Sequence, residues 1–247
     1  MNHRFRSSAL TFCFLASLGS TQAALTHRYS FNDTAVKDSA GKVGAKLKGA
    51  GATLADGKLV LKNDAYLEFD ESVLPKSGSV SLVIWFTAKG TGAFSRLINF
   101  GASEGTEGTN FIYLSPTIDS AGRAAITGSD VSSKTAVDFP AADDGKPHMI
   151  ALVVDGAAKK LRVFVDGAEP IAAESLGENT LEKVKPVENW LGKSSFSADP
   201  GLNASIDEFR VYDHALTLEE AIALHKAGAD VPPASGTAAA KSAGTDK

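Results

Sequence analysis

Apolar and polar residues alternate with a period of two along much of the chain. Such alternation is typical of strands that bury one face of a sheet. Each run is short and is bounded by Gly, Asp, Ser or Asn, which favour turns. The runs span residues 25–31, 59–61, 66–69, 79–87, 96–100, 110–115, 123–127, 148–155, 161–166, 188–191 and 205–212. Many short strands separated by turns predict an all-β sandwich or barrel.

One hairpin is nearly explicit in residues 149–165. A strand of six apolar residues leads into Asp155-Gly156, a second strand returns, and Asp166-Gly167 follows it. Asp-Gly tolerates the positive φ angles of tight turns, so we predict a turn at each pair. On the returning strand Phe164 lies on the opposite face from Val163, which predicts that neither face is purely solvent-exposed.

A single short helix is predicted near the end of the chain. Thr217 and Glu220 have the spacing of a capping box, in which each side chain bonds the other residue's backbone N–H. Gly228 is suited to end the helix. About three turns are too few to form a layer, so we expect the helix to decorate one of the sheets.

Both ends of the chain differ from this pattern. Arg4 and Arg6 precede an apolar run at residues 9–18, and small residues at 21 and 23 suit cleavage after Ala23. We therefore predict a signal peptide over residues 1–23, because a membrane anchor needs about 20 apolar residues. The expected domain spans 24–229, and residues 230–247, rich in Ala, Ser, Gly and Pro, are expected to form a disordered tail or a linker.

The cysteine count and the charge distribution exclude several classes of function. The chain has 247 residues and a net charge of −4, and its one cysteine, Cys13, lies in the predicted signal peptide. A mature chain without thiols excludes disulfides, thiolate metal sites and a cysteine nucleophile. The well-mixed charges predict no nucleic acid partner, and we expect no membrane span in the mature chain. The protein is expected to be exported, as a periplasmic, cell-surface or secreted protein.

Several segments form a series with a consistent order and spacing. They are residues 29–33 with 38–41, 79–87, 148–167 and 189–224. The last is the most specific and contains Ile206-Asp207-Glu208-Phe209 followed by the predicted helix. Together they resemble the laminin G-like, concanavalin A-like jelly-roll domains of exported bacterial proteins. The resemblance covers roughly residues 25–228 and implies two antiparallel sheets packed face to face, with about a dozen strands and one short C-terminal helix.

This fold hosts lectins, glycosidases and interaction modules, so the fold alone does not select an activity. A glycosidase needs two carboxylates flanking the scissile bond. Residues 68–71 lack a third acid at the spacing seen in sandwich glucanases, and Asp207 and Glu208 are adjacent, which predicts that they point to opposite faces. No serine triad and no pair of histidines with zinc spacing is found. We therefore expect no catalysis.

Calcium is the cofactor that the sequence favours, because Ca²⁺ takes loop carboxylate and carbonyl oxygens. Asn32, Asp33 and Asp38 flank a loop after the first strand, and the first and last strands of a sandwich are often neighbours. The resemblance implies a site joining this loop to the Ile-Asp-Glu strand, with Asp38 and Asp207 as the leading ligands. The alternative is that Asp38 only forms a turn and Asp207 only bonds neighbouring strands.

Binding residues are harder to identify. Trp85 lies in the most apolar strand, which predicts a core role, whereas Trp190 fits either an exposed or a core position. Residues 101–110 and 130–144 resemble mobile loops, and such loops often carry binding in sandwiches. We predict an exported, non-catalytic module that binds carbohydrate or an extracellular or envelope protein. The alternatives are a polysaccharide hydrolase of the same superfold and a structural module of the cell envelope.

Overall fold

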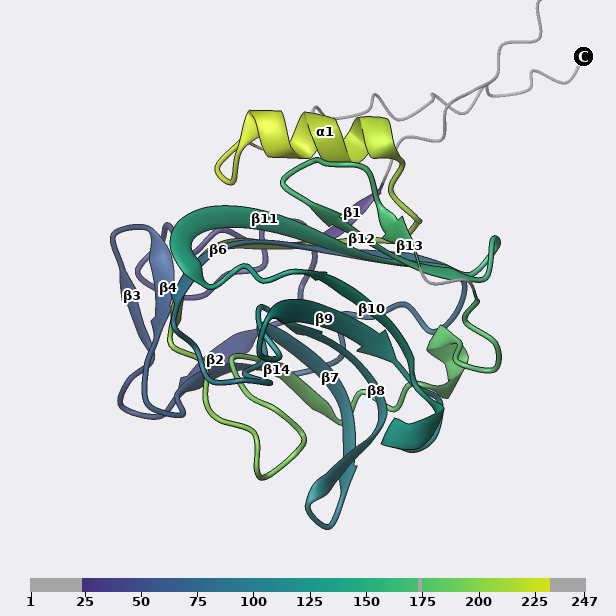
Figure 1. Cartoon of the computed structure of the whole chain (residues 1–247). Helices are drawn as coiled ribbons and strands as arrows, with labels where there is room; N and C mark the ends of the chain where they lie inside the picture. The colour runs from purple at the N-terminus through teal and green to yellow at the C-terminus, as the bar shows by residue number, and fades with distance from the viewer. Residues whose placement is uncertain (1–23, 173–174, 232–247) are drawn as a thin grey trace, which may run out of the picture.

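The computed structural model describes residues 24–172 and 175–231. They form two antiparallel sheets packed face to face, with one α-helix, α1 (Leu218–Ala227), on the outside (Figure 1). Short 3₁₀ helices occur at Val131–Ser133 and Leu181–Lys183. The predicted two-sheet sandwich with a short C-terminal helix is therefore confirmed. No helix in these two ranges is long and apolar enough to cross a membrane.

The eight-stranded sheet carries both the first and the last strand of the domain. Its order is β13 (Ile171–Ala172), β12 (Lys160–Val165), β11 (Asp144–Asp155), β6 (Val80–Lys89), β15 (Ala204–Tyr212), β4 (Lys58–Leu61) and β3 (Thr53–Ala55), with β1 (Leu25–Tyr29) also paired to β15. This pairing confirms that the first and last strands are neighbours.

The seven-stranded sheet is built mainly from the middle of the chain. Its order is β10 (Thr135–Pro140), β9 (Ala121–Ile126), β8 (Glu107–Ser115), β7 (Ile98–Glu104), β14 (Glu188–Leu191), β5 (Tyr66–Phe69) and β2 (Ala45–Lys48). Strands β14 and β5 come from distant parts of the sequence and bring residues 66–69 and 188–191 side by side.

The main hydrophobic core fills the space between the sheets. Its centre is aromatic, because Phe69 contacts Tyr29, Phe100 and Phe209 with ring centroids 5.0–5.8 Å apart. All four rings are almost fully buried. Burial of each such side chain contributes about 1.5–3 kcal/mol, so this cluster stabilises the contact between the sheets.

A second hydrophobic cluster lies on the outer face of the eight-stranded sheet, under α1. It contains Trp85 and Phe164. The burial of Phe164 confirms the prediction that this face of its strand is not purely solvent-exposed. Trp85 is buried as expected, although in this cluster and not between the sheets. The capping box of Thr217 and Glu220 is present, and Gly228 ends the helix with a φ of 83°.

Most predicted strands are found, but the two predicted loops are wrong in part. Residues 101–110 extend β7 and β8 into a long hairpin, and residues 130–144 contain a 3₁₀ helix and β10. The turn at Asp166-Gly167 has positive φ at both residues, whereas in the Asp155-Gly156 turn the positive φ falls on Lys159. Strands β2, β3 and β13 are short and carry little alternation, so the sequence did not predict them.

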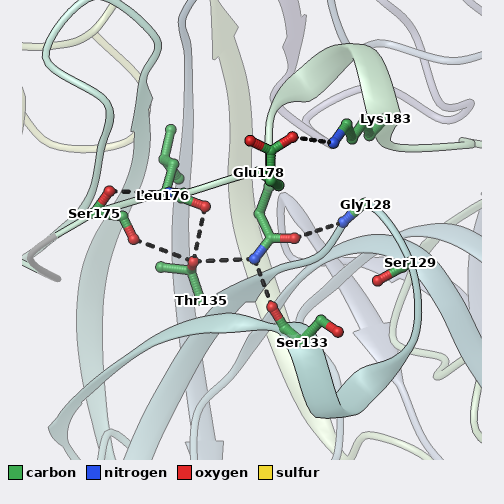
Figure 2. Close-up of a pocket in the computed structure, with 10 residues that line it drawn as sticks. Gly128, Ser129, Ser133, Thr135, Ser175, Leu176, Glu178 and Lys183 are labelled. Carbon is green, nitrogen blue, oxygen red and sulfur yellow. Dashed lines mark hydrogen bonds and ion pairs between the residues drawn. The ribbon is translucent and has the colours of Figure 1, made fainter.

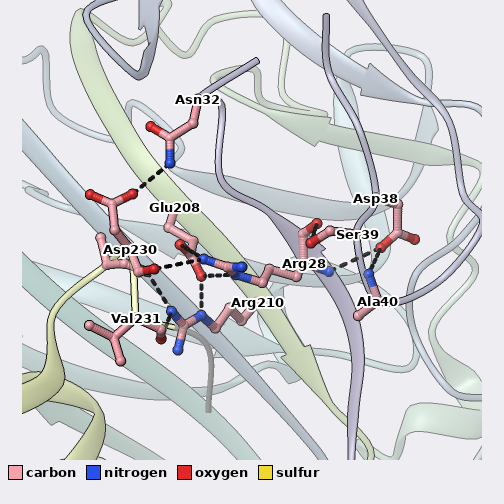
Figure 3. Close-up of polar contacts among 10 residues, drawn as sticks. Arg28, Asn32, Asp38, Ser39, Ala40, Glu208, Arg210, Asp230 and Val231 are labelled. Atoms are coloured by element: carbon pink, nitrogen blue, oxygen red, sulfur yellow. Dashed lines mark hydrogen bonds and ion pairs between the residues drawn. The ribbon is translucent and has the colours of Figure 1, made fainter. Parts of the chain in front are cut away.

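A buried ion network joins both ends of the domain on the outer face of the eight-stranded sheet (Figure 3). Glu208 accepts hydrogen bonds from Arg28 of β1 at 2.8 and 2.9 Å and also pairs with Arg210. Arg210 in turn donates to the carbonyl oxygens of Ala229 and Val231. Glu208 and Arg210 are completely buried. The predicted tail therefore starts with residues that the domain still holds, while the predicted signal peptide and residues 232–247 lie outside the described residues.

A β-bulge corrects one prediction about this strand. The register of β15 against β6 shifts between Ile206 and Glu208, so Asp207 is an extra residue. Asp207 pairs with Lys58, and it lines the same cavity as Trp85, which is the neighbour of Glu208 in the register. The side chains of Asp207 and Glu208 therefore both lie on the outer face of the eight-stranded sheet. The prediction that they point to opposite faces assumed a regular strand and is wrong.

The ion network predicts a large difference between these adjacent acids. Glu208→Gln leaves two arginines without their carboxylate in a buried site, so we expect it to lower the free energy of unfolding by about 3 kcal/mol. Asp207→Asn removes a partly exposed pair with Lys58 and should cost less than about 1 kcal/mol. Urea denaturation followed by circular dichroism measures both, and equal stabilities of the two variants would contradict the prediction.

Candidate functional site

The outer face of the seven-stranded sheet combines aromatic, charged and amide side chains. The register places Tyr113, Asn99, Trp190 and Glu68 beside one another across strands β8, β7, β14 and β5. Their neighbours along each strand point into the core, as period-two alternation requires. On the opposite outer face of the sandwich, α1 packs over the cluster that contains Trp85, whereas no α-helix of the described residues packs on this face.

The connection between β14 and β15, residues 192–203, packs over the middle of this face. Asn99 donates to the Ser195 hydroxyl at 2.7 Å and accepts from the Ser195 backbone N–H at 3.3 Å. Phe196 lies against Gly108, where an added Cβ would come within 2.6 Å of the ring. A glycine is required at that point because the ring contacts the strand directly. The connection thus divides the face into two clusters.

The arginine cluster consists of Phe94, Arg96, Tyr113, Phe196 and Asp199. The Arg96 guanidinium lies 3.8 Å from the centroid of the Tyr113 ring and pairs with Asp199 at 2.8 Å. Phe94 and Phe196 flank it at 5.6 and 5.8 Å. Burial lowers the pKa of Arg96 and raises that of Tyr113. A guanidinium stacked on a ring and paired with a carboxylate is held in one orientation.

Phe94 has an unusual backbone conformation within this cluster. Its φ is 68°, in the left-handed region that bulky residues rarely adopt. Its carbonyl accepts a hydrogen bond from Arg96 at 2.8 Å, and its N–H donates to Thr117 at 3.0 Å. These bonds hold the strained residue with its ring partly exposed. Strain of this kind persists where the surrounding structure imposes it, and it concentrates at functional sites.

The lysine cluster, at the other side of the connection, consists of Lys48, Tyr66, Glu68, Trp190 and Lys193. The rings of Tyr66 and Trp190 meet edge to face with centroids 5.7 Å apart. The Lys193 ammonium lies 4.5 Å from the Tyr66 centroid and 4.2 Å from that of Trp190. Glu68 pairs with Lys48 at 2.8 Å and accepts from the indole N–H at 3.4 Å. The hydrogen bond from Lys48 is the main cause of a lowered pKa at Glu68.

The sequence left Trp190 with either an exposed or a core position, and the structure shows that neither describes it fully. It is 9% exposed, but it belongs to the outer face, where Tyr66 and Lys193 cover it. Tyr66 itself is partly exposed. Partly exposed rings provide apolar faces, and the surrounding carboxylates, amides and cations provide hydrogen-bonding groups. This combination is suited to a ligand that is apolar on one side and rich in hydroxyls at its edges.

A polar pocket lies beyond one end of this face, next to the 3₁₀ helix at Val131–Ser133 (Figure 2). Its volume is about 450 Å³, and it is lined by Gly128, Ser129, Ser133, Thr135, Ser175, Leu176, Gly177, Glu178, Asn179 and Lys183. Asn179 accepts from the Gly128 N–H and donates to the Ser133 carbonyl and the Thr135 hydroxyl. The pocket has no aromatic lining residue, and its polar groups mainly join two loops.

The residues predicted to bind calcium have separate surroundings. Asp38 accepts hydrogen bonds from His27, from the backbone of Arg28 and from backbone N–H groups of its own loop, at 2.7–3.3 Å. Burial opposes ionisation of Asp38, but these bonds outweigh it and hold the pKa below its usual range. Asp207 pairs with Lys58.

The two less certain calcium ligands lie at the surface. Asn32 donates to the Asp230 carboxylate at 2.6 Å, and Asp33 is exposed. In residues 24–172 and 175–231, no cluster of three or more His, Cys, Asp or Glu side chains is arranged to hold a metal ion. Asp38, Asp207 and Asn32 thus bond to different partners, and calcium binding by the four predicted residues stays a prediction.

Sequence reasoning missed most of the candidate site. Phe94 and Arg96 lie in one segment and Lys193 in another, far along the chain, and no local spacing links the two segments. Tyr66 was assigned only to a strand, and Asn99 lay in a predicted strand without a role. The one available signal is the pair of polar residues, Lys193 and Ser194, that follows Gly192 after the Trp190 strand, within the segment that carries the family resemblance.

Comparison with known proteins places the chain in a family. A family model described as the concanavalin A-like lectin/glucanases superfamily matches residues 61–222. That segment includes every residue of the two clusters of the outer face except Lys48. Among curated proteins, no match is found.

Solved structures share the fold. Domain 4 of AbnA, a GH43 extracellular arabinanase from Geobacillus stearothermophilus in complex with arabinotriose, superposes with a TM-score of 0.66 and 22% identity, covering 81% of this chain and 98% of that domain. The Ruminococcus gnavus IT-sialidase CBM40 bound to α2,3-sialyllactose gives 0.57 and 20%, covering 72% and 97%. The binding domain of botulinum neurotoxin DC in complex with rat synaptotagmin II gives 0.60 and 11%, covering 83% and 51%.

The strained backbone of Phe94 predicts an unusual response to glycine. Phe94→Gly removes a left-handed conformation that costs about 1–2 kcal/mol, which offsets the lost contacts of a partly exposed ring. We expect the free energy of unfolding to change by less than about 1 kcal/mol. The matched variant Phe196→Gly has no such relief and loses its edge-to-face contact with Phe111, so it should cost about 2 kcal/mol or more. Urea denaturation compares the two, and an equal loss in both would show that Phe94 is not strained.

Proposed function

Because the chain belongs to the concanavalin A-like lectin/glucanases superfamily, we propose that it binds carbohydrate on the outer face of its seven-stranded sheet. The observation that carries this proposal is the pair of aromatic and cationic clusters on that face, with Tyr66 and Phe94 partly exposed. A sugar ring stacks its C–H face on an aromatic ring and directs its hydroxyls to polar groups at the ring's edges.

Two structural relatives support the choice of carbohydrate over a protein surface. The arabinanase domain is bound to arabinotriose, and the sialidase module is bound to sialyllactose. The neurotoxin domain, in complex with synaptotagmin, shows that the same fold also meets protein partners. In this chain the outer face is rich in charges and hydroxyls and has few exposed aliphatic residues, which fits a glycan better than a dry protein interface.

We propose that the domain acts as a non-catalytic module outside the cytoplasm. The paired acids of β15 support this, because Glu208 is buried between two arginines and Asp207 is paired with Lys58. Neither is placed as a free acid beside a cleft, as glycoside hydrolysis requires. The predicted signal peptide supports export to the periplasm, the cell surface or the medium.

Binding is tested with variants of the exposed rings. We expect Tyr66→Ala to weaken binding to a recognised oligosaccharide by about 1–2 kcal/mol, or roughly five- to thirty-fold, because the stacking surface is lost. Tyr66→Phe keeps the ring and should bind nearly as well as the parent, and Lys146→Met, far from this face, should be unchanged. A glycan array followed by isothermal titration calorimetry measures these values. If no glycan on the array binds the intact domain, the proposal fails.

The same glycans test the non-catalytic assignment. Incubation of the domain with each recognised polysaccharide should release no reducing ends above the level of a denatured control. Sustained turnover would establish the hydrolase alternative, and the acids responsible would then be sought on the outer face, beginning with Glu68.

The structural calcium ion is a separate part of the proposal. If Asp38 and Asp207 hold Ca²⁺ between the opening loop and β15, millimolar calcium should raise the melting temperature above that measured with excess EDTA, since a ligand stabilises the folded state that binds it. Asp38→Asn should abolish the calcium-dependent shift. Identical melting temperatures with calcium and with EDTA would exclude such a site.

A further inference from the structure

Lys193 is held over the aromatic pair by the backbone that precedes it. Gly192 has a φ of 95°, and a Cβ at this position would lie 2.4 Å from the Leu61 side chain. Only glycine fits both the angle and the space, so the chain leaves β14 along one path. Lys193 therefore emerges directly above Trp190 and Tyr66 and is not placed by chance on a mobile loop.

The charge of Lys193 has no carboxylate partner within 4.0 Å among the described residues, whereas its neighbours are paired. Glu68 pairs with Lys48, and Lys46 pairs with Asp70 on the adjoining strand. The lysine cluster therefore holds two cations and one anion and has an excess of one positive charge, in a protein whose net charge is −4. The two rings attract the ammonium, but they do not neutralise it.

An ammonium ion beside a sugar-stacking ring is suited to a carboxylate on the sugar. A charge-assisted hydrogen bond to a carboxylate is about twice as strong as a neutral one, and the partly covered surface near Trp190 limits its screening by water. The lysine stem is flexible, so the ammonium can move from the rings toward the ligand and leave the Tyr66 face free for stacking. A neutral sugar would meet the same cation without any compensating charge.

We propose that Lys193 is a specificity-determining residue and that the lysine cluster binds an acidic saccharide, with the sugar carboxylate on Lys193 and a sugar ring on Tyr66. This inference rests on the proposed carbohydrate function and names the class of ligand. Two sources share the required chemistry, which are chains of uronic acid residues and glycans that end in a nonulosonic acid. Both place a carboxylate on a pyranose ring.

The experiment uses ligand pairs that differ only in the charge of the carboxyl group. Oligogalacturonate is compared with its methyl ester, and sialyllactose is compared with the methyl ester of its sialic acid, by isothermal titration calorimetry on the full chain. We expect at least one acidic member to bind at least tenfold more tightly than its neutral counterpart, with an affinity that falls as sodium chloride rises from 50 to 300 mM. The pair that shows the preference identifies the source.

Three variants then assign the effect. Lys193→Met keeps the stem and should remove the tenfold preference and most of the salt dependence, whereas Lys193→Arg should keep both. Lys46→Met removes another exposed cation from the same sheet and should leave the preference intact. Thermal melting of each variant confirms that it is folded, which is expected because Lys193 is partly exposed.

The alternatives give distinct results. If the neutral ligands bind as tightly as the acidic ones, or if Lys193→Met leaves the acidic preference unchanged or strengthens all binding by uncovering the rings, the inference is overturned while carbohydrate binding stands. If none of the four ligands binds and a glycan array is also blank, the proposed function fails and the inference fails with it.

Discussion

Side chains on each strand point alternately between the two sheets and away from them, and the burial of the inward set is the constraint on which the remaining features depend. The rings of Tyr29, Phe69, Phe100 and Phe209 fill the centre of that space. Once the inward faces are buried together, the two outer faces are left with different surroundings. Helix α1 packs on one, over the cluster that contains Trp85, and the connection of residues 192–203 packs on the middle of the other.

The buried ion network holds both ends of the domain on β15. Strand β1 and the segment after α1 lie at opposite ends of the sequence, and both rest on β15. Glu208 joins Arg28 to Arg210, and Arg210 holds the carbonyl oxygens of the segment after the helix. Buried charges are costly to desolvate, so such a network contributes less to stability than its number of bonds suggests. The network nevertheless links β1, β15 and the segment after α1 to one another.

The candidate site depends on how residues 192–203 divide the outer face of the seven-stranded sheet. The connection that packs on Asn99 and Gly108 separates an arginine cluster, held rigidly by Asp199 and Tyr113, from a lysine cluster in which one cation has no acidic partner. In the first cluster a strained Phe94 keeps its ring partly exposed. Rigid aromatic groups beside oriented charges bind a ligand with little loss of conformational freedom, and this is the property expected of a recognition module.

The sequence by itself determined the strands with clear alternation, the capped helix and the family. These features are local or are repeated in a fixed order, so spacing along the chain records them. Short strands such as β2 and β13 were not predicted, because a few residues carry too little alternation of apolar and polar side chains. The bulge at Asp207 was not predicted, because it depends on the pairing of β15 with β6 and not on the local sequence pattern.

Only the tertiary structure decided which side chains form the candidate site. The register of β5 and β14 brings Tyr66 next to Trp190 across more than a hundred residues of sequence, and Gly192 then directs Lys193 onto both rings. An aromatic residue in an alternating strand has the same local pattern whether it faces the core, as Phe100 does, or the outer face, as Trp190 does. What differs is the element that packs against each face, and that choice is made by contacts between distant segments and not by the residue's neighbours in sequence.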